Sequence, residues 1–544
     1  MKKVRLILGL MLVGLGAGCL ENSSSTPGTA ATILYRHHFL GAAHLAHNTN
    51  DAKIPAILAL PATHELSEEI LQKLSRKPDE LWRKFLGANA STSPALVRPL
   101  LEDLASAESY AEVRGPLDRS ESVLAIELSE ERANLWRANL GNILTAWKLG
   151  KPSPLSLGAA QGWEVKRAES PMLIQLVRAG QWVLVGAGQE RLTLLPGLLE
   201  QVNKSGRPLV LQPNVPLEFE ADFPRLNDWL PGLAPYKLPP VHLTLTGKGD
   251  YLRTEVTLSY SDPLPLTLEP WRFPTNIIKD PIVSFTVARG IAPLLSQVKG
   301  FSTLGLKPLP NQFCAWGPAT VHADTFLTIP VANPSNALYQ IGPKLPEFTT
   351  ELLSQSIGGF TLISNRNELL WQGWPVLLPH LRAIREDGAD YLLGGLFPMP
   401  RSTNPPPPEL FSQLKDKPKL VYYDWEFTPE RLVHAEQFQQ LWDMVNNRKF
   451  PPTNAPTQKW LKAIAPQLAN TITEGTLSAP KEVTIVRKSD FGLTGIELAT
   501  LARWVESAGF PWSFEPAKAP SRPKPKTSGS KTNVPPAKSP ALKR

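Results

Sequence analysis

The alternation of apolar and polar residues between positions 241 and 260 constrains the fold of this chain most. Residues 241–246 alternate strictly, a turn rich in glycine follows at 247–250, and residues 252–260 alternate again. Successive side chains of a strand point to opposite faces of the sheet. The pattern therefore predicts a long antiparallel hairpin with one apolar face and one solvated face.

Strands that lead into capped helices recur elsewhere in the chain. The apolar run Ser122–Leu128 precedes Ser129, which is a favourable N-cap for a helix with acidic residues in its first turn. Near the C-terminal end, the run Leu420–Phe427 precedes Thr428 as a cap and Pro429 at a first helical position. The same local order thus predicts both strands and helices along the chain.

An order of strand, helix, hairpin and second helix can be traced in three places, 122–202, 282–384 and 420–507. In the middle copy the second helix is expected over 376–384. The unequal spacing leaves two interpretations open, divergent internal repeats or an ordinary α+β order without repeats. The predicted fold class is α+β, with mostly antiparallel sheets, helices packed on one face, and two or three divergent modules if the repeats are real.

Composition divides the chain into segments. Residues 405–408 are four consecutive prolines, which are typical of a stiff spacer between modules. We predict a leader, a flexible tether, an α+β module, a β-rich middle module, the proline spacer, a second α+β module and a disordered tail. Their bounds are 1–19, 20–31, 32–206, 207–404, 405–408, 409–515 and 516–544.

The N-terminal end has the pattern of a bacterial export signal. Three basic residues within positions 2–5 precede an apolar and glycine run, 6–18, which ends at Cys19 before the sequence turns polar. The run is too short to cross a bilayer, which takes about 20 apolar residues. The residues Ala17, Gly18 and Cys19 resemble the lipobox of bacterial lipoproteins, although Gly16 stands where that family favours leucine.

The resemblance implies that Cys19 is the first residue of the mature protein and carries acyl chains. Each buried methylene contributes about 0.8 kcal/mol to membrane attachment, so several chains anchor a protein firmly. The implied location is the cell envelope, facing the periplasm or the outside. Leu20, in place of aspartate, favours the outer membrane by the same resemblance. The alternatives are an ordinary cleaved signal and an uncleaved anchor.

The net charge of +8 comes from the ends of the chain. The tail 516–544 contains eight basic residues and no acid, whereas residues 19–515 carry a net charge of −3. The body therefore lacks the basic face expected of a specific nucleic-acid-binding fold. The tail has too few apolar side chains to fold, and its prolines favour the polyproline II conformation.

The tail is a candidate for electrostatic contacts. Anionic envelope polymers and lipid headgroups are the partners that its charge would attract. A solvated extension without a specific partner is the alternative. The candidate contact residues are Lys518, Arg522, Lys524 and Lys526.

The small number of cysteines excludes two ways of stabilising the folded body of the chain. With only Cys19 and Cys314 present, the body has neither a disulfide framework nor a cysteine-based zinc site. Aromatic neighbours predict that Cys314 is a buried thiol. The alternative, a nucleophile assisted by His322 or Asp324, would require those side chains to converge in space.

Five of the nine histidines lie between positions 37 and 64. His44 and His47 would share one face of a helix and are weak candidates for metal ligands, but the zinc motif His-Glu-x-x-His is absent. Surface histidines are the simpler interpretation. The chain also lacks a phosphate-binding loop and a nucleophile-elbow motif, and no cofactor is predicted.

These patterns favour a noncatalytic cell-envelope lipoprotein that binds or scaffolds a ligand. The ligand would be hydrophobic or an envelope polymer, and the identity of any protein partner is open. The alternative function is an exported hydrolase that uses a metal held by the histidines of 37–64.

Overall fold

The computed structural model describes 32–47, 53–79, 92–116, 119–167, 171–189, 191–208, 215–227, 237–297, 301, 304–320, 324–347, 361–364, 367–372, 377–399, 402–445, 452 and 454–511. The predicted leader, the tether up to residue 31 and the tail lie outside these residues. No helix within the described ranges is long and apolar enough to cross a membrane.

The strands are β1 Ile33–Phe39, β2 Ser109–Arg114, β3 Glu121–Glu127, β4 Ser153–Leu157, β5 Ala160–Lys166, β6 Met172–Ala179, β7 Trp182–Gln189, β8 Leu217–Ala221, β9 Val241–Gly247, β10 Leu252–Ser259, β11 Ile282–Arg289, β12 Gln312–Pro318, β13 Phe326–Pro330, β14 Thr361–Ser364, β15 Glu368–Gln372, β16 His380–Glu386, β17 Ala389–Gly395, β18 Leu420–Phe427, β19 Asn470–Ala479 and β20 Glu482–Ser489.

The α-helices are α2 Ala42–Leu45, α3 Lys53–Leu58, α4 Pro61–Ser75, α6 Pro94–Ser106, α7 Glu130–Ala146, α8 Leu194–Ser205, α9 Phe223–Leu226, α10 Ala292–Leu295, α11 Pro334–Ile341, α13 Pro408–Lys415, α14 Thr428–Val445, α15 Pro456–Ile464 and α16 Gly495–Glu506.

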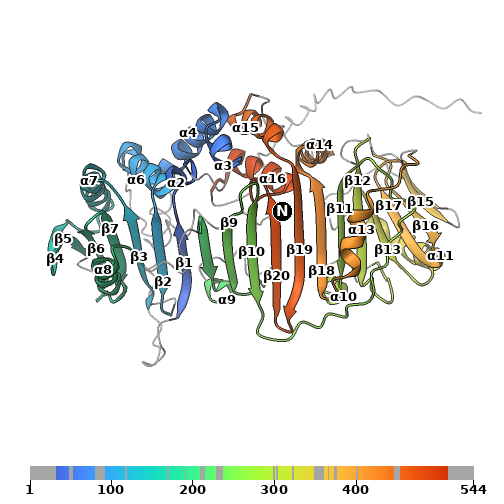
Figure 1. Cartoon of the computed structure of the whole chain (residues 1–544), viewed down its shortest axis with the longest axis horizontal. Helices are drawn as coiled ribbons and strands as arrows, with labels where there is room; N and C mark the ends of the chain where they lie inside the picture. Colours follow the sequence, from blue (N-terminus) through green and yellow to red (C-terminus); the bar gives the residue numbers. More distant parts are fainter. Residues whose placement is uncertain are drawn as a thin grey trace, which may run out of the picture.

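All the described strands belong to one twenty-stranded antiparallel sheet that runs the length of the molecule (Figure 1). The register of the neighbouring pairs gives the order β4-β5-β6-β7-β3-β2-β1-β8-β9-β10-β20-β19-β18-β11-β12-β13-β17-β16-β15-β14. The α+β class and the antiparallel pairing are therefore confirmed.

The two halves of the sheet have the same strand order. Counted inward from the free edge, the first half runs 4-5-6-7-3-2-1-8-9-10, and the second half repeats this order with ten added to each number. The halves meet where β10 pairs with β20, from Leu252 opposite Ser489 to Ser259 opposite Glu482. This seam joins strands that lie far apart in the sequence.

Local features recur at matching places in the two halves. Gly41 follows β1 with φ 89°, and Gly290 follows β11 with φ 75°. Each glycine leads into a short helix, α2 or α10. An irregularity interrupts the register of β1 with β2 between Ile33 and Tyr35, and that of β11 with β12 between Ile282 and Ser284.

Around β3, in the first half, helices cover both faces of the sheet, which differs from the predicted single covered face. In β3, Leu124 and Ile126 belong to the core that α7 buries, whereas Val123 and Ala125 belong to the core that α8 buries. Alternate residues of a strand point to opposite faces. A strand that is apolar at every position therefore needs a cover on each side, and the run 122–128 is of this kind.

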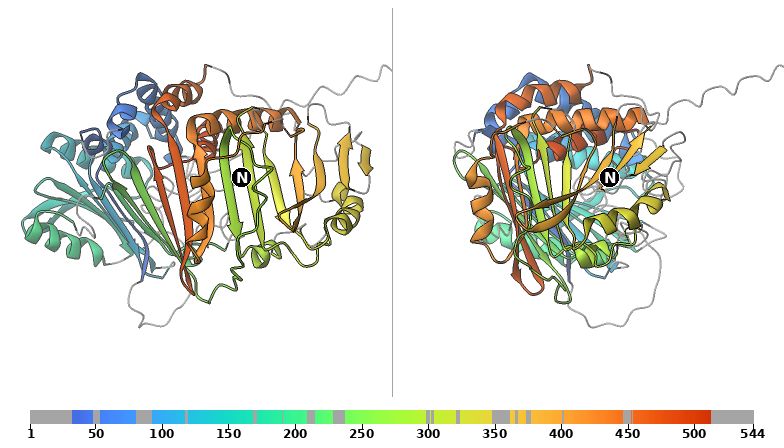
Figure 2. Two further views of the ribbon diagram at one scale, coloured as in Figure 1. Left: turned by 45° about the vertical axis from the view of Figure 1, so that its right-hand side comes forward. Right: turned by 90° about the vertical axis from the view of Figure 1, so that its right-hand side faces the viewer.

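A second set of contacts joins the halves at one end of the strands, where helices from both lie along the rim of the sheet (Figure 2). One continuous apolar core contains Leu66 of α4, Trp136 of α7, Trp460 of α15 and Leu498 of α16. Polar contacts reinforce it, because Lys73 Nζ donates to the backbone oxygen of Val505 at 3.0 Å.

The structure decides several local predictions. The antiparallel hairpin predicted over 241–260 is confirmed as β9 and β10. The predicted difference between a buried and a solvated face is not seen, because every residue of β9 is half-buried. The helix expected over 376–384 is wrong for the described part, because residues 380–386 form β16 between β15 and β17. Pro379 precedes this strand, and proline disfavours a helical conformation in the residue before it. The predicted module boundaries stay predictions, and the sheet continues past them, since β1 pairs with β8 and β11 with β18.

The positive φ of Gly41 gives a stability test. An added Cβ there would lie 2.3 Å from the backbone oxygen of Ser106, so Gly41→Ala should lower the free energy of unfolding by at least about 1 kcal/mol. Gly197, an exposed residue of α8, has open space around it and is the matched control. Gly197→Ala should raise stability by about 0.5–1 kcal/mol. Urea unfolding measures both, and equal effects would contradict the packing at Gly41.

Candidate functional site

A cleft of about 1180 Å³ lies in the second half of the sheet. Its walls come from segments 269–275, 306–312 and 330–340, from the turn 387–391 between β16 and β17, and from α13. Five stretches that are distant in the sequence thus meet around one opening. A large concave site with a few polar groups is the usual form of a ligand site.

Buried polar side chains hold one wall in place. Gln312, 1% exposed, accepts a hydrogen bond of 2.9 Å from the backbone N–H of Arg272 and donates one of 2.8 Å to the oxygen of Pro270. The guanidinium of buried Arg289 donates to the backbone oxygens of Leu420 and Glu269. These hydrogen bonds pair buried donors and acceptors that would destabilise the fold if they were left unsatisfied. They also hold this wall of the cleft against the sheet.

Aromatic side chains supply much of the cleft surface. Trp271, Phe273 and Phe411 are half-buried there, and Tyr391 is buried. The rings of Phe273 and Phe411 lie 5.3 Å apart, and the Arg289 guanidinium lies 4.5 Å from the ring centroid of Trp271. Packed against one another in this way, the aromatic rings form a firm surface for a ligand.

A longer hairpin distinguishes the cleft from the matching place in the first half. Trp182 opposite Glu127 and Tyr391 opposite Pro330 occupy equivalent register positions. The β6–β7 hairpin turns immediately beside Trp182, whereas the β16–β17 hairpin continues for two more residue pairs beyond Tyr391. This extension brings the turn at Asp387 to the cleft.

The turn makes one end of the cleft acidic. Burial raises the pKa of Tyr391, and the charges of Glu386 and Asp387 raise it further. The negative charge of Asp390 is only partly neutralised, because its ion pair with Arg385 is 3.8 Å long and the Arg385 side chain is mostly exposed. The turn is thus a local concentration of negative charge.

The lining as a whole carries no net charge. Its acids are Glu269, Asp387 and Asp390, and its bases are Arg272, Lys307 and Lys415. The exposed side chains of Asn336 and Gln340 on α11 face the same cleft and offer both donors and acceptors. The combination suits a ligand with many neutral polar groups.

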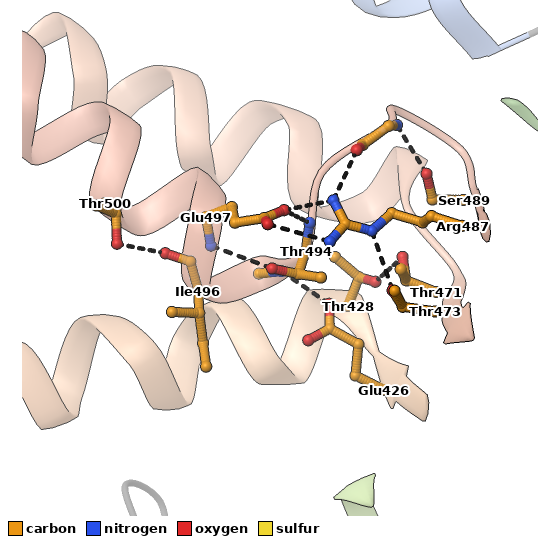
Figure 3. A network of polar contacts seen from close by, with 12 residues as sticks. Glu426, Thr428, Thr471, Thr473, Arg487, Ser489, Thr494, Ile496, Glu497 and Thr500 are labelled. Atoms are coloured by element: carbon orange, nitrogen blue, oxygen red, sulfur yellow. Dashed lines mark hydrogen bonds and ion pairs between the residues drawn. The ribbon is translucent and has the colours of Figure 1, made fainter. Parts of the chain in front are cut away.

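A separate buried polar network joins the end of the sheet to α16 (Figure 3). Oε1 of Glu426 accepts a hydrogen bond of 2.7 Å from the backbone N–H of Gly495, the first residue of the helix. Arg487 donates to Glu497 at 2.6 Å, and Thr494 forms a capping box with Glu497. The positive end of the helix dipole favours a carboxylate at this place.

Burial controls the ionisation of this network. Glu426 is 2% exposed, and burial together with the charge of Asp424 raises its pKa to about 7. Burial also raises the pKa of Asp424, although a hydrogen bond of 2.6 Å from Thr286 opposes the rise. Arg431, 4.0 Å from Glu426, offsets only part of the burial effect on Glu426.

The network is a structural joint between α14, α16 and the sheet. A Cβ at Gly495 would lie 2.6 Å from the backbone nitrogen of Leu432, so the two helices touch backbone to backbone. The polar groups of the joint bond to one another, and Glu426 and Asp424 are both buried. None of them lines the cleft. We therefore take the cleft as the candidate ligand site.

The structure places the histidines apart. His44 and His47 are exposed on and just after α2, and His64 is exposed on α4. His37 and His38 are buried on opposite faces of β1, where His37 pairs with Tyr35. Within the described ranges, no three histidine, cysteine or acidic side chains are arranged to hold a metal ion.

The prediction of a buried thiol at Cys314 is confirmed. The side chain is 1% exposed in an apolar core, and burial raises its pKa. A thiol with a raised pKa is a poor nucleophile. His322, Cys19 and the tail residues Lys518, Arg522, Lys524 and Lys526 lie outside the described residues.

Comparison with known proteins yields no relative. No family model, no curated protein and no solved structure matches the chain.

Little in the local sequence indicates the cleft. Its aromatic residues stand in no local motif, and the short stretch Asp387-Gly388 is the one local signal near it. That stretch has positive φ at both residues, 50° and 75°, and Asp-Gly is a typical two-residue hairpin turn. This signal could have located the acidic end of the cleft.

The raised pKa of Glu426 predicts a pH-dependent stability. Between pH 4.5, the ordinary value, and about 7, the folded protein holds a proton that the unfolded chain releases. The free energy of unfolding should therefore fall as pH rises through this window, by about 3 kcal/mol from this group. Glu426→Gln should remove that part of the fall in urea unfolding from pH 4 to 8.

Exposed Glu409 on α13 provides the control. Glu409→Gln should leave the pH profile of the wild type unchanged. A Glu426→Gln profile as steep as that of the wild type would contradict the assignment of a raised pKa to Glu426.

Proposed function

We propose that the chain is a noncatalytic lipoprotein of the bacterial cell envelope that binds an envelope polymer in the cleft of its second half. The observation that carries the proposal is the cleft, which is large, open and lined by aromatic rings together with charged and amide side chains. Such a lining can contact an extended ligand by stacking and hydrogen bonding at once.

The lining favours a polar polymer over a hydrophobic ligand. Six of its residues, three acids and three bases, are charged, and several more carry amides. Burying an acyl chain against these groups would remove them from water without a partner, at a cost of about 1–3 kcal/mol for each unsatisfied group. A polymer with hydroxyl or amide groups can instead form hydrogen bonds with these side chains in place of the displaced water.

The proposed lipid anchor and the basic tail support the cellular location of the protein in this proposal. The lipobox-like residues 17–19 support acylation of Cys19 and placement at a membrane, with the outer membrane favoured by Leu20. The basic tail supports an additional attraction to anionic polymers or headgroups. The exported hydrolase of the sequence analysis has no specific observation in its favour among the described residues.

We also infer that the two halves of the sheet are divergent copies of one ancestral unit. The shared strand order, the matching glycines Gly41 and Gly290, and the matching register irregularities support it. The copies would span β1–β10 and β11–β20, a division different from the three copies read in the sequence. Only the second copy has the long β16–β17 hairpin that borders the cleft.

Binding to purified peptidoglycan sacculi tests the function. In sedimentation assays the full chain should bind, and replacing Asn336 and Gln340 together with alanine should weaken binding about thirtyfold. Each lost hydrogen bond accounts for about 1 kcal/mol. Assays at 0.5 M salt screen the contribution of the tail.

Gln440, exposed on α14 away from the cleft, gives the matched control. Gln440→Ala should bind like the wild type. Equal binding by the double variant, or no binding by the wild type, would contradict an envelope-polymer site in the cleft.

The anchor has its own test. The wild type should fractionate with membranes and carry acyl mass on Cys19, whereas Cys19→Ala should be unacylated and released, because the acyl chains supply the attachment. Intact mass and fractionation measure both properties. An unmodified, soluble wild type would contradict the anchor.

A further inference from the structure

We propose that the cleft recognises the sugar rings of a glycan, a chain of N-acetylated pyranose units, and that one ring stacks on Trp271. The proposal rests on the proposed function and deepens it, because it names the part of an envelope polymer that the cleft binds. The ligand is a neutral sugar chain rather than the peptide part or an anionic group of the polymer.

The backbone on both sides of Trp271 is held by one buried side chain. Gln312, which is 1% exposed, accepts a hydrogen bond from the N–H of Arg272 and donates one to the oxygen of Pro270. The Trp271 ring itself is only half-buried and lines the cleft. A ring that is already fixed in place loses little conformational freedom when a ligand binds to it.

The inner face of the Trp271 ring is covered by a fixed cation. The guanidinium of Arg289, a residue that is 6% exposed, lies 4.5 Å from the ring centroid. It donates hydrogen bonds of 2.7, 2.8 and 2.6 Å to the backbone oxygens of Leu420, Glu269 and Pro418. Because these bonds hold the guanidinium, the ring has a rigid support and its remaining surface is available to a ligand in the cleft.

The first half of the sheet lacks these two supports. Leu40 and Glu108 stand at the places of Arg289 and Gln312 when the halves are aligned on the glycines that follow β1 and β11. The fold therefore does not require this pair of side chains. They fit a role that only the second half has, namely to hold an aromatic ring at the cleft.

Aromatic rings and sugar rings attract each other face to face. The face of an aromatic ring carries partial negative charge, and the C–H groups on the face of a pyranose carry partial positive charge. Phe273 and Phe411, whose rings lie 5.3 Å apart, extend the aromatic surface of the cleft beyond Trp271. A chain of several sugar rings can therefore contact the cleft at more than one place.

Neutral amides of α11 supply the polar contacts. Asn336 and Gln340 are exposed and line the cleft, and side chains four residues apart on a helix have Cβ atoms about 5–6 Å apart. This spacing is similar to the length of one sugar unit. Each amide offers donors and an acceptor that can pair with the acetamido group of an N-acetylated sugar. The three acids and three bases of the lining balance one another, which favours a neutral ligand.

Calorimetric titration of the full chain with the linear hexamer of β-1,4-linked N-acetylglucosamine tests the proposal. This probe has sugar rings and acetamido groups but neither peptide nor charge. The wild type should bind it with a Kd of about 1 mM or tighter. Trp271→Ala should weaken the binding about tenfold or more, whereas Trp271→Phe keeps an aromatic face and should stay within about threefold of the wild type.

Two further variants separate stacking from a loss of structure. Trp271→Leu keeps an apolar side chain in the wall and should weaken binding as much as Trp271→Ala. Trp442, half-buried on α14 and stacked on Phe438, does not line the cleft, so Trp442→Ala should bind the hexamer like the wild type. Equal binding by Trp271→Leu and the wild type, or no binding of the hexamer by the wild type, would overturn the proposal.

The sugar assignment and the proposed function fail in different ways. If sacculi bind in the cleft but the hexamer neither binds nor competes, only the sugar assignment is overturned, and competition by stem peptides released from sacculi would identify the peptide as the ligand. If the hexamer binds through Trp271 while sacculi do not bind, only the proposed function is overturned. If neither binds, both are overturned.

Discussion

The pairing of β10 with β20 is the interaction on which the architecture depends. Each half of the sheet ends in one of these strands, and an unpaired strand edge exposes a row of backbone donors and acceptors. Eight consecutive residue pairs between β10 and β20 pair the backbone donors and acceptors of both strand edges. The two halves thereby become one antiparallel sheet, related across the seam by a common strand order.

The joint at the rim reinforces the seam. α16 follows β20 directly, and Glu426 and the capping box fix its first turn to the end of β18. The helix then contributes Leu498 and Ala502 to the core that also buries α4 and α7 of the first half. The strand pairing and the helical core therefore couple the same two halves. The cleft beyond β11 therefore forms on a sheet whose two halves are held together by these contacts.

The sequence predicted what depends on neighbouring residues. The hairpin of 241–260, the cap at Ser129 and the buried thiol of Cys314 follow from local alternation, capping and apolar surroundings, and the structure confirms them. The β10–β20 seam could not be predicted, because an alternating strand does not specify which distant strand it pairs with.

The joint and the cleft were missed for the same reason. Glu426 and Gly495 are 69 residues apart, and nothing local marks Glu426 as a partner for a helix N-terminus. The cleft gathers five separate stretches, of which only the Asp387-Gly388 turn has a local signature. The helix expected over 376–384 is wrong because Pro379 disfavours a helical conformation before it and residues 380–386 pair with β15 and β17.

Hydrogen–deuterium exchange at the seam tests the account most directly. If β10 and β20 form the centre of one sheet, peptides that cover 252–259 and 482–489 should exchange slowly and to similar extents, as slowly as the interior strands β6 and β7. Rapid exchange of both peptides, at the rate of the edge strand β4, would mean that the halves are separate sheets and would contradict the account.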